Sequence, residues 1–361
     1  MKKKILSFIS CKLFGGIMKT FGIKERMYAM ENNFFSPYAC RSNQTKGRQR
    51  VEESCNMRTE FQRDRDRIIY SKAFLRLKNK TQVFFSPEGD HFRTRLTHTI
   101  DVSQIARSIS RCLALNEDLT EAIAMGHDLG HTPFGHAGER VLRKLNPNGF
   151  EHNEQSLRVV DVLEKDGAGL NLTYEVRDGI LNHKKTGNPI TLEGKVVSIS
   201  DRIAYINHDI DDAIRAGVLK KEELPKAEIE ILGSSSRERI NTMITSIYQN
   251  SLGKNEVKMG KIEAEALESL RSFMFDKVYI TELTQIEEER ANRMLSGMFE
   301  YFTNNKDKLP SFYKKLLDKY SIEQVLCDYL SSMTDKYAVA LFNYLYVPRS
   351  WALRQEDFEE I

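Results

Sequence analysis

The chain has 361 residues, 40% of them hydrophobic, which is enough for one large domain or two smaller ones with a sizeable core. The net charge of +3 is unevenly distributed, because residues 1–50 hold 11 Lys/Arg against 2 acids and residues 51–361 therefore sum to −6. This slightly acidic body argues against non-specific nucleic-acid binding, which needs a basic surface that neutralises many phosphates. A small anionic substrate needs only a local cationic pocket.

Residues 1–50 carry Gly, Asn and Lys without apolar periodicity. The first twenty resemble a signal peptide, but Lys12 interrupts the apolar run and no small-x-small cleavage site follows. We expect a disordered basic tail, or an upstream start codon with Met18, Met27 or Met30 as the true start. No window approaches the ~20 apolar residues of a membrane span, so we expect no membrane partner.

The cysteines are odd in number, widely scattered and form no C-x-x-C pair; they are Cys11, Cys40, Cys55, Cys112 and Cys327. This pattern argues against a disulfide framework and against a zinc knuckle. We therefore expect a cytoplasmic protein.

From residue 51 onward the apolar spacing predicts helices. Ile105, Ile109 and Cys112 recur at helical spacing within 100–115, and Asn116 offers an N-cap for the next helix. Further helices are expected at about 137–145, 153–165, 173–183 and 194–215, and amphipathic ones between Pro225 and Pro310. The only strand candidate is 81–85. We expect an all-α fold with a catalytic core at 51–220 and additional C-terminal helices, at 221–361, packed on it.

All eight histidines fall between His91 and His208. His98, the adjacent pair His127-Asp128, and Asp201 supply nitrogen and carboxylate ligands from separate segments. This set suits a divalent cation that keeps positions open for water and a phosphate oxygen. The pattern indicates a metal-dependent phosphohydrolase.

The densest block of candidate residues is 127–139, where glycines and a proline predict a turn that returns His131 and His136 toward the metal ligands. His136 and Glu139 are three residues apart at a predicted helix start, so the carboxylate can orient the imidazole for proton transfer. Isolated histidines are more often structural, and we interpret His91, His183 and His208 in that way.

Asp201, Tyr205 and Asp209 fall at i, i+4 and i+8 of one predicted helix, so they share a face. Such a face is either solvated or binds a ligand. Arg95 and Arg202 are candidates for binding phosphates, although either could pair with a surface acid. No P-loop motif is present, which excludes a P-loop ATPase.

These residues resemble the HD-domain phosphohydrolases, and more narrowly the deoxyguanosine triphosphate triphosphohydrolase-like family. The similarity covers about 61–217 and includes RDRDRI at 63–68, KTQVF at 80–84, RTRLTH at 93–98, the block at 127–139 and EHN at 151–153. A weaker match is MTDKYA at 333–338. One departure is Leu75, where the family usually has a second arginine, which puts a local ion pair, a subunit contact or an effector contact in doubt.

The resemblance implies an HD-domain helical core that hydrolyses dGTP and other deoxynucleoside triphosphates at the α-phosphorus, giving deoxynucleoside and tripolyphosphate. The matching positions are His98, His127, Asp128 and Asp201 for the metal, His136 and Glu139 for catalysis, Arg95, His131, His152 and Arg202 for the phosphates, and Gln82, Tyr205 and Asp209 for the deoxyribose. The implied cofactor is Mn²⁺ or Mg²⁺, with Ni²⁺, Zn²⁺, Fe²⁺ and Co²⁺ as alternatives. The implied partners are a second copy of the chain, in a homo-oligomer, and a nucleotide effector or single-stranded DNA.

Two other functions stay open at this point. The chain could be a different HD-domain phosphohydrolase, acting on nucleoside monophosphates, cyclic nucleotides or guanosine polyphosphates. It could also be a non-catalytic protein that binds nucleotides or single-stranded nucleic acid, but such a protein would be expected to lack a ligand or the His–Glu pair, and neither is lost here.

Overall fold

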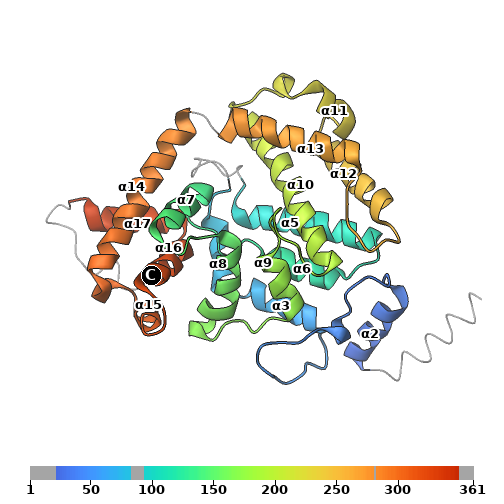
Figure 1. Ribbon diagram of the computed structural model, residues 1–361, viewed down its shortest axis with the longest axis horizontal. Helices are drawn as coiled ribbons and strands as arrows, with labels where there is room; N and C mark the ends of the chain where they lie inside the picture. Colours follow the sequence, from blue (N-terminus) through green and yellow to red (C-terminus); the bar gives the residue numbers. More distant parts are fainter. Residues whose placement is uncertain (1–21, 83–92, 280–281, 349–361) are drawn as a thin grey trace, which may run out of the picture.

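The computed structural model describes residues 22–82, 93–279 and 282–348, and these ranges are helical (Figure 1). Within them the only β-type pairings are two isolated bridges, Arg48 with Thr173 and Thr81 with Thr94. The all-α prediction is therefore confirmed. A strand was expected at 81–85. Thr81 makes one of the two bridges, and residues 83–85 lie outside the described residues.

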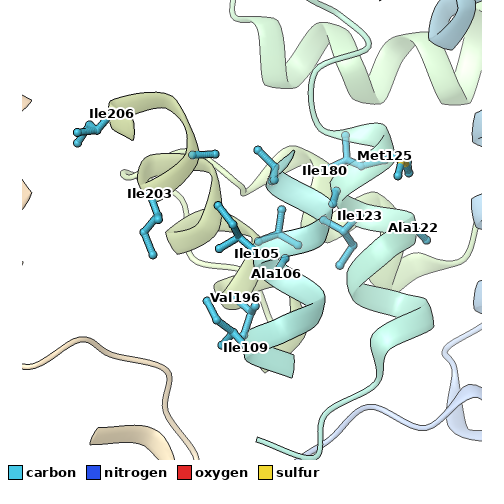
Figure 2. Packing of buried hydrophobic residues seen from close by; sticks show 14 of the residues in the cluster. Ile105, Ala106, Ile109, Ala122, Ile123, Met125, Ile180, Val196, Ile203 and Ile206 are labelled. Atoms are coloured by element: carbon cyan, nitrogen blue, oxygen red, sulfur yellow. The ribbon is translucent and has the colours of Figure 1, made fainter. Parts of the chain in front are cut away.

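Four helices form the centre of the larger hydrophobic cluster, which we call the first core: α5 (Arg95–Cys112), α6 (Glu117–Gly126), α9 (Tyr174–Leu181) and α10 (Leu192–Arg215). Figure 2 shows residues of this cluster from three of these helices, among them Ile109 of α5, Ile123 of α6 and Ile203 of α10. The predicted cap is confirmed, because the Asn116 side chain accepts hydrogen bonds from two backbone N–H groups at the start of α6. The packing of these helices fixes the relative positions of α5, α6 and α10.

Other helices complete the first core on its outside. They are α3 (Glu60–Ile69), α4 (Lys72–Arg76), α11 (Lys226–Leu232), α12 (Ser236–Ser251) and α13 (Lys261–Met274). Residues of the segment 221–279 thus pack in the same hydrophobic cluster as helices of the segment 51–220.

A second core lies on the other side of the molecule (Figure 1). It is formed by α7 (Gly135–Leu145) together with α14 (Glu282–Asn304), α15 (Ser311–Leu316), α16 (Ile322–Ser332) and α17 (Asp335–Tyr346). Val141 and Leu142 place α7 in this cluster, although its neighbours in sequence belong to the first core. The functional block at 127–139 therefore crosses from one core to the other.

Between the two cores lies α8 (His152–Arg158), which continues as a π-helical turn over Val159–Leu163. Arg158 forms a bidentate ion pair with the buried Asp328 of α16, and the Gln155 side chain donates a hydrogen bond to the same carboxylate. These bonds tie α8 to the second core.

The basic N-terminal segment differs from expectation where it is described. Residues 23–34 form α2 (Ile23–Phe34), and further along Arg48 makes a buried ion pair with Asp64 of α3. An ordered segment therefore precedes residue 51, and only residues 1–21 of the expected tail lie outside the described ranges. Among the described helices, none is both long and apolar enough to cross a bilayer.

Candidate active site

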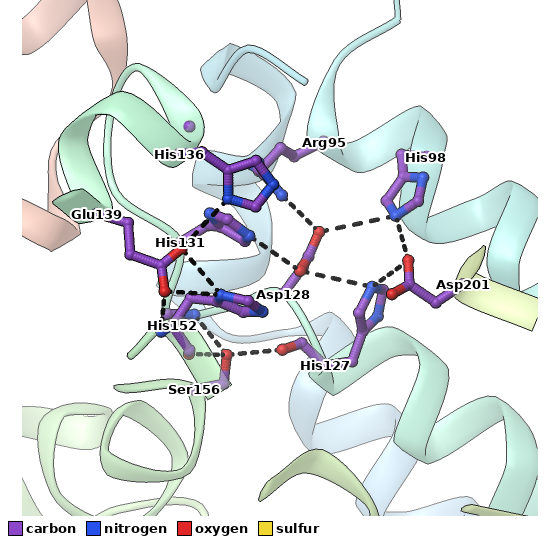
Figure 3. Close-up of polar contacts among 12 residues, drawn as sticks. Arg95, His98, His127, Asp128, His131, His136, Glu139, His152, Ser156 and Asp201 are labelled. Atoms are coloured by element: carbon purple, nitrogen blue, oxygen red, sulfur yellow. Dashed lines mark hydrogen bonds and ion pairs between the residues drawn. The ribbon is translucent and has the colours of Figure 1, made fainter. Parts of the chain in front are cut away.

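The four predicted metal ligands come together from three helices (Figure 3). His98 lies on the first turn of α5, His127 and Asp128 follow the last residue of α6, and Asp201 lies in the middle of α10. Oδ1 of Asp201 is 3.1 Å from Nε2 of His98 and 3.9 Å from Nε2 of His127. Oδ1 of Asp128 is 3.5 Å from Nε2 of His127.

These side chains fit a metal ion. The His127 ring donates from Nδ1 to the carbonyl of Ala124 at 2.6 Å, so its lone pair is at Nε2, which is buried without a protein partner. Single ligand atoms of His98, His127 and Asp128 lie within 4.8 Å of one another, and Asp201 approaches from the side of His98. Mixed imidazole and carboxylate donors suit a divalent transition metal or Mg²⁺.

The electrostatics of Asp128 also favour a cation-binding carboxylate. Its burial opposes ionisation, but His127, Arg95, His131 and His98 together lower its pKa well below the usual range. The Arg95 guanidinium, 2% exposed, lies 2.8 Å from Oδ2 of Asp128. Arg95 is therefore a buried partner of the metal cluster and not part of a surface ion pair.

Glu139 contacts two histidines: His136, as expected from the sequence, and also His152. Its Oε2 is 3.3 Å from Nδ1 of His136, as the sequence predicted, and both of its oxygens are 3.1 Å from Nδ1 of His152. Burial raises the pKa of Glu139, but the hydrogen bonds from the two histidines outweigh it and hold the pKa far below the usual range. His136 itself is 69% exposed at the cavity, whereas His152 is buried.

His183, which the sequence suggested was structural, belongs to this group. It donates from Nδ1 to the carbonyl of Ile180 at 2.7 Å, so its Nε2 can only accept, and that atom is 3.3 Å from Nε2 of His152. A hydrogen bond between the two rings must then be donated by Nε2 of His152, whose Nδ1 faces the Glu139 carboxylate. Burial lowers the pKa of His183 to about 3, consistent with a neutral acceptor.

The close approach of the turn after Asp128 to helix α8 depends on a glycine. A Cβ atom at Gly130 would collide with the backbone of Gln155 and Ser156 on α8. Instead the N–H of Gly130 donates to the Ser156 hydroxyl at 2.9 Å, and that hydroxyl in turn donates to the His127 carbonyl at 2.7 Å. The turn after the His127-Asp128 pair is thereby held directly against the helix that begins with His152.

One cavity of about 390 Å³ joins these groups. Its lining includes most of the predicted site residues, namely Gln82, Arg95, His98, Asp128, His131, His136, His152, Asp201, Arg202, Tyr205 and Asp209. His127 and Glu139 lie behind this surface, in contact with residues that line it. All three side chains of the Asp201–Tyr205–Asp209 face border the cavity, so this face of the helix is not in open solvent.

Two acceptors that line the cavity are buried without a protein partner: Oε1 of Gln82 and Oδ1 of Asp209. The other oxygen of Asp209 accepts a hydrogen bond from Tyr279, and burial raises the pKa of Asp209 to about 7. Burial also raises the pKa of Tyr205, to about 12, so this phenol stays protonated. Unsatisfied buried acceptors at a cavity surface are suited to a ligand hydroxyl.

Several lining residues were not identified from the sequence. Besides His183 they are Thr81, Phe134, Ala137, Arg140, Lys184, Lys185, Arg271, Phe275, Tyr279 and Glu288. Lys184 and Lys185 could have been suspected because they follow His183 directly. Arg271 and Tyr279 come from a region without any motif, and only the packing of α13 on α10 brings them to the cavity.

Two histidines and Leu75, the position that differs from the family pattern, do not line the cavity where the structure describes them. His208 lies beside the site as a structural residue, with Nε2 3.0 Å from Asp101 and its ring against that of His98. His91 lies outside the described residues. Leu75 is 58% exposed on α4, where an arginine would reach solvent rather than the cavity.

Comparison with known proteins agrees with this geometry. The HD domain model matches residues 95–206, and the phosphohydrolase-associated domain model matches residues 257–344. A deoxyguanosinetriphosphate triphosphohydrolase-like protein of Caldanaerobacter subterraneus subsp. tengcongensis is 58% identical over 91% of this chain and 97% of its own. Proteins of the same description from Clostridium perfringens and Geobacter sulfurreducens are 48% and 37% identical, over 91% and 90% of this chain and 98% of each relative.

The cavity lies where the region of the HD model meets that of the associated domain, since Tyr205 comes from the first and Arg271 from the second. Sequence identity at this level over nine-tenths of the chain establishes the family. The protein is a hydrolase that belongs to the deoxyguanosinetriphosphate triphosphohydrolase-like family of HD-domain phosphohydrolases.

Proposed function

We propose that this protein hydrolyses deoxynucleoside triphosphates at the α-phosphorus, releasing a deoxynucleoside and tripolyphosphate. The observation that carries the proposal is the composition of the single cavity described above. A His/Asp cluster, several cationic side chains and two unpartnered acceptors line the same space. The names of the related proteins support the same substrate class.

His98, His127, Asp128 and Asp201 would hold a divalent cation, with Mn²⁺ or Mg²⁺ as the proposed metal. When bound, such an ion lowers the pKa of its water and neutralises charge on the α-phosphate. His127 contributes Nε2, because its Nδ1 is committed to the Ala124 carbonyl.

The triphosphate carries about four negative charges, and the cavity offers more cations than the sequence suggested. Arg202, Lys184, Lys185 and Arg271 all line it. Arg95 is engaged with Asp128, so its role is to balance that carboxylate and to present its remaining N–H groups to a phosphate oxygen. The proposed residues for the phosphates are therefore Arg95, His131, His152 and Arg202, with the two lysines and Arg271 as additions.

His136, oriented by Glu139, is the proposed acid–base residue. Its exposure to the cavity leaves Nε2 free to exchange a proton with substrate or solvent, while Nδ1 faces the carboxylate. Removal of negative charge from the 5′-oxygen of the departing nucleoside requires a proton at that atom, and His136 is the exposed histidine at the cavity that can donate it.

At the other end of the cavity, Gln82, Tyr205 and Asp209 are the proposed deoxyribose site. Tyr205 lies one turn and Asp209 two turns beyond Asp201 on α10, so a sugar attached to a phosphate held near Asp201 falls against them. The free oxygens of Gln82 and Asp209 would accept from the 3′-hydroxyl.

The test is incubation of the purified protein with each of the four deoxynucleoside triphosphates and the matched ribonucleotides, in Mn²⁺ and in Mg²⁺, with ³¹P NMR of the products. Tripolyphosphate in a one-to-one ratio with deoxynucleoside is the expected outcome. Orthophosphate or pyrophosphate as the first product would contradict it and would indicate a different HD-domain phosphohydrolase.

A further inference from the structure

The turn that leads into His136 has an unfavourable backbone conformation. Phe134 has φ 61° and ψ 24°, in the left-handed region that bulky residues rarely adopt, and Gly135 follows with φ 55°. A conformation of this kind persists only when the surroundings hold it in place. Part of that support is local, since the Thr132 hydroxyl donates to the Gly135 carbonyl at 2.8 Å.

Further support comes from a residue 201 positions away. The N–H of Phe134 donates to Oδ1 of Asp335 at 3.1 Å. Asp335 is the first residue of α17, is 4% exposed and does not line the cavity. Nothing in the proposed chemistry requires this carboxylate.

The second oxygen of Asp335 holds another segment of the site. Oδ2 accepts from the N–H of Thr81 at 2.9 Å and also from the Thr81 hydroxyl. Thr81 directly precedes Gln82, whose carbonyl lies where a Cβ at Gly135 would approach to 3.3 Å. One buried carboxylate thus holds both the turn before His136 and the residue before Gln82.

Lys80 reinforces the same junction. Its buried ammonium donates to the carbonyls of His131 and Ser331, the latter at the end of α16, and its own carbonyl accepts from the Arg95 N–H at 3.0 Å. The segment at 80–82 therefore lies between the start of α5, the turn at 131–135 and the α16–α17 connection.

This junction matters because the site is divided between two cores. The metal ligands belong to helices of the first core, whereas α7, with His136 and Glu139, packs in the second. A relative displacement of about 1 Å between reacting groups can cost on the order of 10²-fold in rate. The contacts of Asp335 fix the two halves at the point where they meet.

We propose that Asp335 is a positioning residue that sets His136 and Gln82 relative to the metal ligands. The inference rests on the proposed function, because it assigns Asp335 an effect on turnover through His136. It also gives the phosphohydrolase-associated region a defined contribution to the HD-domain site.

The first experiment compares Asp335→Asn with Tyr313→Phe. An amide keeps one acceptor, so one of the two N–H donors loses its partner while the volume is unchanged. Tyr313→Phe is the matched control, since it removes a 2.8 Å hydrogen bond to Ser332 within the same second core but away from the cavity. We expect Asp335→Asn to lower kcat by about 10²-fold with metal content retained, while the control stays within about 2-fold.

A double-mutant cycle separates positioning from general destabilisation. In a His136→Ala background, Asp335→Asn should lower kcat by less than about 3-fold further, because most of its effect acts through the missing His136 side chain and displacement of Gln82 gives only the small remainder. If the kcat loss of the double variant equals the product of the losses of the two single variants, the proposal is overturned. Thr81→Val, which removes one donor to the same carboxylate, provides a second and milder variant with the same expected pattern.

Amide hydrogen exchange tests the contacts independently of the substrate. Asp335→Asn should speed exchange in peptides covering 77–82 and 129–138, and Tyr313→Phe should not. Unchanged exchange in both peptides would overturn the proposal whatever the activity. If the wild type hydrolyses none of the deoxynucleotides, the proposed function fails, and the exchange result decides alone whether Asp335 holds these segments.

Discussion

Oδ1 of Asp201 lies 3.1 Å from Nε2 of His98, although 103 positions separate the two residues in the chain. In the absence of a cation, a carboxylate this close to an imidazole is a hydrogen-bonded pair, and His127 completes a triangle with them at 3.9 Å from Asp201. Burial opposes the ionisation of Asp201, but His98 and His127 lower its pKa below the usual range. The three side chains fit a metal ion, since a cation can replace the proton between His98 and Asp201 and can bind the lone pair on Nε2 of His127.

Removing the metal should abolish turnover and lower Tm. A ligand present at 100 times its Kd stabilises the folded state by about 2.7 kcal/mol, so adding Mn²⁺ to EDTA-treated protein should raise Tm measurably. His127→Ala and Asp201→Asn should lose both the metal, by elemental analysis, and this response. Asp211→Asn is the control on the same helix, because Asp211 pairs with Arg239 outside the cavity. Full turnover after exhaustive EDTA treatment would contradict the prediction.

His136→Ala and Glu139→Gln should each lower kcat by about 10²–10⁴-fold with metal content unchanged, the usual range for loss of acid–base catalysis. Glu139→Gln should have the larger effect, because Glu139 contacts His152 as well as His136. Metal loss equal to that of His127→Ala would show that the pair belongs to the metal site instead.

The enzyme should prefer deoxyribonucleotides to ribonucleotides. A 2′-hydroxyl packed against Tyr205 would clash or leave polar groups without partners, a penalty of about 1–3 kcal/mol for each stranded group. Tyr205→Ala should narrow the preference, as measured by kcat/KM for dGTP and GTP. Tyr248→Ala, an exposed tyrosine on α12, should leave it unchanged. Equal rates for the two sugars in the wild type would refute the deoxyribose site.

The stability of the fold should depend on pH through Glu193 near the start of α10. Its Oε1 accepts from the N–H groups of Cys40 and Asn116 at 3.0 Å, while Oε2 is buried without a partner. Burial raises the pKa of Glu193 from 4.5 to about 7. The folded state therefore binds the proton more tightly than the unfolded state does, and the free energy of unfolding falls as pH rises from about 4.5 to 7.

Glu193→Gln mimics the neutral form at every pH. Its free energy of unfolding relative to wild type should rise by up to about 3 kcal/mol between pH 5 and pH 8, a few degrees in Tm. Glu222→Gln, at an exposed position, should show no such change because its side chain stays in water in both states. If the difference in free energy of unfolding between the wild type and Glu193→Gln is constant across this pH range, the prediction is contradicted.

The sequence by itself predicted most of the helices around the site. Ile105 and Ile109 in α5, the Asn116 cap of α6, and the Asp201–Tyr205–Asp209 stripe of α10 are local features, because helical periodicity and capping depend on residues a few positions apart. The candidate ligands were found in the same way, by residue type and spacing within short blocks.

Only the tertiary structure decided which core each block joins. Nothing near Val141 indicates that α7 packs with α14–α17 rather than with α5 and α6, because both choices bury the same apolar face. The contacts of His183, Tyr279 and Asp335 were not predicted for a related reason: their partners lie 31, 70 and 201 positions away. Contacts at such separations depend on how whole helices pack, and the spacing of residues within a single segment does not encode that packing.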